Sequence, residues 1–329
     1  MNKEEATTVK GIAILMMLFL HLFCFEDRCD YLIILDNRPL LTMLTEASNP
    51  VPLFLLISGY GLYSAYLKGD NNRYLRLAKL YIHYVTIFLF FLAVKWIVDG
   101  SIALSILDFI MNLLAYKTSI APICWFLFPY IILSLLSHFL FKMLDRYSTV
   151  LILIISWGMF CISVMMLSKC GELLSKYNLI TQIVSVLNLQ FPFLLGAAVC
   201  KKQWYARIRK YLRIRFFCVI LIVMLVLLMV LIKIDLLNPL YAFFLIPLLL
   251  EVIRGNFIKT FLSCLGKHSM NIWLIHGWFC YYIFGKELYS LRLPLLIFSS
   301  CLLLSWGTSI LIDKITKPIE GLLCRQRIF

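Results

Sequence analysis

The sequence predicts an all-α integral membrane protein, a bundle of about ten transmembrane helices with both termini in the cytoplasm. Three observations predict this fold class. Of the 329 residues, 62% are hydrophobic and the mean hydropathy is +0.92, whereas a soluble domain is roughly 45–50% apolar. The apolar residues gather in stretches of roughly 17–25 residues, the length of a helix that crosses a bilayer. Finally, most of the 31 Lys and Arg residues lie between these stretches, on one predicted side.

The apolar stretches define the predicted spans. They are residues 9–25, 51–67, 80–98, 123–141, 149–167, 181–200, 215–234, 238–254, 269–285 and 293–312. The weakest are 181–200, which contains Gln190 and Pro192, and 238–254, which contains Pro247, because these residues are unfavourable inside a span. A shorter stretch, 102–115, contains Asp108 and is typical of an interfacial or re-entrant helix.

The distribution of basic residues sets the orientation. Lys and Arg are enriched in cytoplasmic loops, and this rule is satisfied when both termini are cytoplasmic. The densest basic cluster, residues 201–215, then faces anionic lipid headgroups, so the net charge of +14 indicates contact with membrane lipids and no nucleic acid. The protein is therefore predicted to be a multi-pass protein of the cell membrane.

The chain is predicted to form one domain, residues 1–329, because no repeat or low-complexity linker divides it. The first apolar run continues to Phe25 without a small-residue cleavage site, so it is predicted to stay as the first span. The 11 cysteines form no Cys-x-x-Cys pair. They therefore indicate neither a disulfide framework nor a metal site.

The first span contains the most unusual pair of residues. Lys10 and His21 are eleven positions apart, which places them within about 20° on one helix face and about 16 Å apart along the axis. A neutral imidazole inside a membrane could accept a proton from a hydroxyl group. The alternative is a histidine that only forms hydrogen bonds between helices, and the spacing alone leaves both open.

The second and third spans also carry candidate polar residues. In the second span, Ser58 and Tyr60 could line a polar cavity, and Gly59 and Gly61 would let helices approach closely. Simple helix packing is the alternative for this segment. At the start of the third span, basic residues recur every three or four positions and form one stripe, suited to phosphate groups or to membrane anchoring. These residues are Arg73, Arg76, Lys79 and His83.

The ninth span is predicted to begin at Ser269 as an N-cap. His276 would then lie about 10 Å into the membrane from the cytoplasmic side and share a cavity with His21. A purely structural hydrogen bond is the competing interpretation.

Taken together, these segments resemble the acyltransferase type 3 family of bacterial membrane O-acyltransferases. The resemblance runs from about residue 8 to 320. The family's first-helix pattern is a basic residue, ten intervening residues and a histidine, and Lys10 and His21 match it. Later motifs of the family are matched in the same order by Ile57 to Tyr60, Arg73-x-x-Arg76, Trp125 to Leu127 and Gly266 to His276. Two features depart from the family: Lys10 stands where Arg is usual, and the proline expected soon after Arg76 is absent.

The resemblance implies a fold, a reaction and site residues. It implies transfer of acetyl from acetyl-CoA, bound from the cytoplasm as a substrate rather than a tightly bound cofactor, to a hydroxyl of a cell-surface polysaccharide or its lipid-linked precursor. It places the protein in the bacterial cytoplasmic membrane, with polysaccharide-assembly proteins as candidate partners. On this hypothesis His21 is the general base, His276 or Ser58 orients groups or stabilises the oxyanion, and Lys10, Arg73 and Arg76 bind the donor.

Two other classes of protein remain open on the sequence. A transporter or flippase of a lipid-linked saccharide often has repeated halves and interrupted helices at matching positions, which this sequence does not show. A non-catalytic membrane subunit of a polysaccharide-assembly complex would leave the histidines without a proton-transfer role. Binding or consumption of acetyl-CoA distinguishes these classes from an acetyltransferase.

Overall fold

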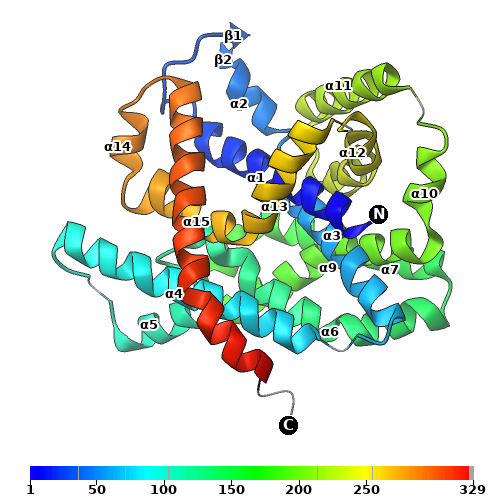
Figure 1. The fold of residues 1–329 in the computed structure, drawn as a ribbon, viewed down its shortest axis with the longest axis horizontal. Helices are drawn as coiled ribbons and strands as arrows, with labels where there is room; N and C mark the ends of the chain where they lie inside the picture. The colour runs from blue at the N-terminus through cyan, green and yellow to red at the C-terminus, as the bar shows by residue number, and fades with distance from the viewer. Residues whose placement is uncertain (36, 71, 103, 213, 254, 326–329) are drawn as a thin grey trace.

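The computed structural model is a helical bundle with one small hairpin (Figure 1). It describes residues 1–325 except 36, 71, 103, 213 and 254. The α-helices are α1 (Lys3–Phe23), α2 (Leu40–Thr45), α3 (Val51–Leu67), α4 (Arg73–Asp99), α5 (Ile106–Leu113), α6 (Leu127–Arg146), α7 (Thr149–Lys169), α8 (Gly171–Lys176), α9 (Asn178–Lys202), α10 (Trp204–Arg209), α11 (Arg215–Ile232), α12 (Asn238–Val252), α13 (Asn256–Gly277), α14 (Gly285–Tyr289) and α15 (Pro294–Arg325). Short helical turns are η1 (Pro122–Phe126), η2 (Asp235–Leu237) and η3 (Trp278–Tyr282), and β1 (Ile34–Leu35) pairs antiparallel with β2 (Arg38–Pro39).

Every predicted span overlaps a helix, which confirms the all-α class, although the span 269–285 follows α13 only to Gly277 and then passes through η3 to the start of α14. Among the described residues, 8 helices are long and apolar enough to cross a membrane, while α3 is apolar but shorter. Pro192 and Pro247 lie inside continuous helices, α9 and α12, so the two weakest predictions are also helical. The stretch 102–115 contains α5, a helix of 8 residues, and its position relative to a membrane stays a prediction, as does the orientation of the termini.

The first helix begins earlier than the apolar run suggested. Asn2 caps it: its side chain accepts a hydrogen bond from the Glu5 N–H at 2.8 Å, and the Glu5 carboxylate accepts one from the Asn2 N–H at 2.8 Å. This reciprocal capping box satisfies amide groups that a helix start leaves without partners. Hydropathy could not detect it because the first turn is polar. The helix ends at Phe23, so His21 lies in its last turn.

The prediction that Ser269 starts a helix is wrong. Helix α13 begins at Asn256, and Ser269 lies in its interior, where its hydroxyl donates to the Gly266 carbonyl at 2.9 Å. The apolar pattern begins near Ser269 because the preceding helical turns contain Lys259, Lys267 and other polar residues. The same helix ends at Gly277 and passes into the wider turn η3, a π-type insertion of the kind often found at functional sites.

Two helix pairs form the closest contacts of the bundle: α1 with α13, and α3 with α9. Figure 1 shows α13 beside α1 near the centre of the molecule. In the second pair, a Cβ atom at Gly59 would overlap the Phe193 carbonyl, and one at Gly196 would overlap the Leu56 carbonyl. Gly59 therefore serves the close approach that the sequence suggested, whereas Gly61 has no neighbour within 4 Å of such an atom and does not.

Candidate active site

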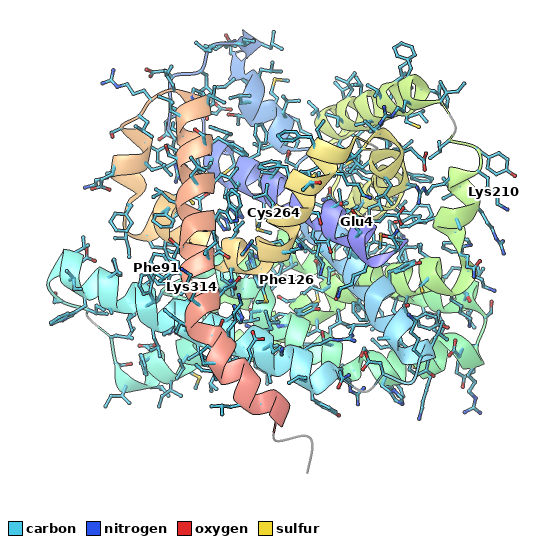
Figure 2. All side chains as sticks on the ribbon, in the orientation of Figure 1. Glu4, Phe91, Phe126, Lys210, Cys264 and Lys314 are labelled. Carbon is cyan, nitrogen blue, oxygen red and sulfur yellow. The ribbon has the colours of Figure 1, made fainter. Side chains whose placement is uncertain are left out.

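A cavity of about 590 Å³ opens between α1, α3, α4, η1, α6 and α13. Lys10, His21, Ser58, Arg73 and Arg76, which come from three helices, all line it. Phe126 also lines the cavity and lies near the centre of the molecule (Figure 2). Its ring packs in a T-shaped arrangement with that of Trp273 of α13, and the two ring centres are 5.4 Å apart. Five of the six residues proposed from the sequence thus line one cavity.

His21 is held from one side by a tyrosine of the turn η3. The Tyr281 hydroxyl donates to the His21 carbonyl and lies 3.4 Å from Nδ1 of the same residue. With the hydroxyl proton directed at the carbonyl, the Tyr281 oxygen accepts a hydrogen bond from Nδ1 when the His21 ring carries its proton there. This tautomer leaves Nε2 with a free lone pair, which is the state that a general base needs.

His276 is placed differently from the prediction. It is fully buried and does not line the cavity; its ring centre lies 5.2 Å from that of His21. Its Nδ1 faces the Ile272 carbonyl at 3.0 Å, four residues earlier in the same helix. Because α13 packs along α1, His276 contacts the His21 ring without reaching the cavity. The expectation that both histidines share the cavity is wrong.

Arg73 and Arg76, at the start of α4, form the basic end of the cavity, and Lys10 of α1 also lines the cavity. Arg73 donates to the Tyr74 hydroxyl at 2.9 Å, but its buried Nη1 has no hydrogen-bond partner among the described residues. Arg76 forms an ion pair with Asp70, while Lys10, although half-buried, forms no hydrogen bond or ion pair within the described part of the chain. A buried guanidinium nitrogen and an ammonium without partners provide unused donors for an anion.

The predicted basic stripe on α4 is divided between two places. Arg73 and Arg76 face the cavity, but Lys79 forms an ion pair with Glu320 of α15 at 2.8 Å. The His83 ring lies between Glu320, 2.7 Å from Nε2, and the side-chain oxygen of Asn271, 2.7 Å from Nδ1. Lys79 and His83 therefore connect α4 to α13 and α15. The sequence could not reveal this division because the partners are about 190 residues or more away in the chain.

Ser58 lies on the cavity-facing side of α3. Its hydroxyl is 2.6 Å from the Tyr130 hydroxyl of α6, and both side chains line the cavity. When Tyr130 donates in this pair, the Ser58 proton is available to an oxyanion. Tyr60, the other polar candidate on this helix, instead accepts a hydrogen bond from the amino terminus at 2.8 Å.

These features define a cavity within the helical bundle that is lined by the His21 imidazole, by basic side chains and by the paired hydroxyls of Ser58 and Tyr130. Within the described residues no group of three or more His, Cys, Asp or Glu side chains is arranged to hold a metal ion. A family model described as an acyltransferase domain matches residues 5–314. No curated protein and no solved structure matches the chain. The chain belongs to the acyltransferase type 3 family, and it is a multi-pass membrane acyltransferase.

Tyr281 is a residue that the sequence analysis missed. It positions His21 through two atoms, so replacing it with Phe should lower kcat about tenfold, the effect of one lost hydrogen bond, with little change in the donor KM. The pH profile of kcat should also shift, because the imidazole loses a hydrogen-bond partner. The matched control is Tyr289→Phe, which removes a hydroxyl that donates to the neighbouring Leu22 carbonyl at 3.2 Å. If the pH profile of kcat is unchanged in Tyr281→Phe, Tyr281 only packs against His21 and does not position it through hydrogen bonds.

Proposed function

We propose that the protein transfers acetyl from acetyl-CoA to a hydroxyl group of a cell-surface polysaccharide or its lipid-linked precursor. The observation that carries this proposal is that His21 and the basic residues Lys10, Arg73 and Arg76 line one continuous cavity. A base and a cluster of phosphate-binding groups in one space suit a donor with a charged head and a reactive thioester tail.

The basic end is the proposed site for the phosphates of acetyl-CoA. Lys10 and His21 are about 16 Å apart along α1, so an extended pantetheine arm running along this helix would bring the thioester toward His21. The free donor of Arg73 would bind phosphate oxygens, whereas Lys10 would act as a point charge, since ammonium lacks the planar fork of guanidinium. The predicted cytoplasmic position of this end agrees with a cytoplasmic donor.

The proposed reaction is a single acyl transfer. Nε2 of His21 removes the proton of the acceptor hydroxyl, and the oxygen attacks the carbonyl carbon of the thioester. Ser58 donates to the oxyanion that forms. The C–S bond then breaks, and His21 returns its proton to the departing thiolate, which leaves the acetyl ester and coenzyme A. Because His276 does not line the cavity, its proposed role is to hold the His21 ring in place.

Arg73→Ala tests the donor site. We expect the KM for acetyl-CoA to rise about tenfold or more, because a charge-assisted hydrogen bond is lost, while kcat changes little. With S-acetylpantetheine, which lacks the nucleotide phosphates, the variant and the intact protein should behave alike. Initial rates of ester formation in purified membranes measure both constants.

The matched control for this test is Arg146→Ala. Arg146 lies in the last turn of α6, is exposed and does not line the cavity, so its loss removes the same charge from the same predicted side. An equal effect of Arg73→Ala on both donors would overturn the phosphate-binding role.

A further inference from the structure

The end of the cavity away from Arg73 has the opposite charge. Glu46 and Asp235 line it there, together with Asn49 and Asn238. Helix α3 connects the two ends, since its lining residues run from Val51 beside Asn49 to Leu62, about 16 Å along the axis. The proposed donor site uses the basic end and His21, so the acidic end has no role in it.

Three separate parts of the chain build this acidic end. Glu46 and Asn49 lie in the connection between α2 and α3, Trp125 lies in η1, and Asp235 and Asn238 lie in and directly after η2. These segments are far apart in the sequence, and each is short and follows the end of an element. A ligand-binding site assembled from several loops on a rigid scaffold is the usual arrangement.

The polar groups of the acidic end are incompletely paired. Asn238 is only 7% exposed, and its buried Oδ1 accepts no hydrogen bond from the described part of the chain, while its Nδ2 donates to Asp235 at 3.2 Å. Asp235 forms no ion pair with any described residue, and Glu46 has only a distant one, 3.9 Å from Arg38. A buried polar atom without a partner costs free energy. The wall therefore offers the buried acceptor of Asn238 and the carboxylates of Asp235 and Glu46, of which only Glu46 has an ion pair within the described residues.

A second cavity, of about 370 Å³, meets the first at this end. The two share Asn49, Val51, Trp125, Asp235 and Asn238 in their walls. The second cavity continues past Phe160 and Val164 of α7 to Asn188 of α9. A ligand made of several linked rings would therefore have space on both sides of the wall that the two cavities share, whereas a single small molecule would need only one cavity.

We infer that the acidic end binds the acceptor, and that the acceptor is a carbohydrate without negative charge at the bound rings. This inference rests on the proposed function. Sugar hydroxyls are hydrogen-bond donors, and the oxygens of Asp235 and Asn238 accept such bonds. The exposed indole of Trp125 provides an apolar surface for a ring face. A uronic or sialic acid would place its carboxylate beside Asp235 and Glu46, and like charges at an interface are strongly unfavourable.

The test titrates the protein in membranes with surface glycan from the producing organism, from which existing esters have been removed chemically, and with labelled acetyl-CoA. Asp235→Asn, nearly identical in shape, and Asn238→Ala should each raise the apparent KM for glycan about tenfold and leave the KM for acetyl-CoA unchanged. The control is Asp27→Asn, which removes the same charge from an exposed residue that lines neither cavity. The labelled sugar is then isolated and its charge determined.

We expect the label on a neutral or amino sugar. Label on a uronic or sialic acid would overturn the inference, as would an unchanged glycan KM in both variants or an equal rise in the two KM values. The absence of label with the intact protein would overturn the proposed function itself. That result is distinguishable, because it appears before any variant is compared.

Discussion

Replacing His21 with Ala should reduce acetyl transfer about 10²–10⁴-fold, the usual contribution of a general base. The reason is that His21 is the one histidine among the described lining residues of the cavity, with Nδ1 directed at Tyr281 and Nε2 without a hydrogen-bond partner among the described residues. Donor binding should persist, since Lys10 and Arg73 are untouched. The measurement compares initial rates of ester formation with equilibrium binding of acetyl-CoA in the same membranes.

A matched control for His21 is His138→Ala. His138 lies on α6 beside Tyr66, at a ring distance of 5.3 Å, and lines neither cavity, so its loss should leave transfer within about twofold of the intact protein. Transfer that survives His21→Ala would remove His21 from the role of base. In that event His276→Ala becomes the decisive variant, since its buried Nε2 lacks a partner among the described residues.

The second large effect is expected at the contact of α1 with α13. A Cβ atom at Gly266 would overlap the Thr7 carbonyl, and one at Gly11 would overlap the Leu262 carbonyl. Because backbone atoms cannot move aside as flexible side chains do, Gly266→Ala should cost about 3 kcal/mol or more. The helices that carry His21 and His276 would separate. We expect a lower thermal midpoint of the purified protein and a loss of activity in proportion to the loss of folded protein.

Gly61→Ala provides the comparison for this effect. Gly61 is also a helical glycine, but an added Cβ atom meets nothing within 4 Å, so this substitution should be neutral or slightly stabilising through helix propensity. Equal thermal midpoints for Gly266→Ala and Gly61→Ala would show that the contact of α1 with α13 has room for a methyl group at Gly266.

Much of the fold follows from hydropathy, because the bilayer requires long apolar helices and these leave a strong pattern. The pattern is weaker where a helix continues through polar residues. Helix α1 extends back to Lys3 and α13 to Asn256, in both cases through charged turns that hydropathy reads as loop. Capping and backbone hydrogen bonds, rather than apolar content, set these boundaries.

Part of the candidate site could be predicted from the sequence for a similar reason. Periodicity on one helix correctly placed Lys10 and His21 on the same face, and Arg73 and Arg76 on another, because such spacing is local. Contacts between different helices could not be predicted from residue spacing. His276 contacts His21 from α13, and Tyr281 contacts it from the turn η3, which follows α13 after Gly277. No spacing rule connects residue 281 to residue 21.

The position of His21 also bears on how the two substrates would meet. It lies in the last turn of α1, far along this helix from Lys10, and the acidic residues Glu46 and Asp235 line the cavity beyond the basic end. On the proposed function, donor and acceptor approach the base from opposite ends of one cavity. Such an arrangement would allow an acetyl group from one side of the membrane to reach an acceptor on the other.

The most direct measurement is transfer of labelled acetyl from acetyl-CoA to extractable glycan in membranes with and without the intact protein. The proposed function predicts label that appears only with the protein, that is released by mild alkali as an ester requires, and that depends on His21. An absence of label, with the protein folded and the glycan of its own organism present, would contradict it. The function would then have to be sought in the transport of a lipid-linked saccharide.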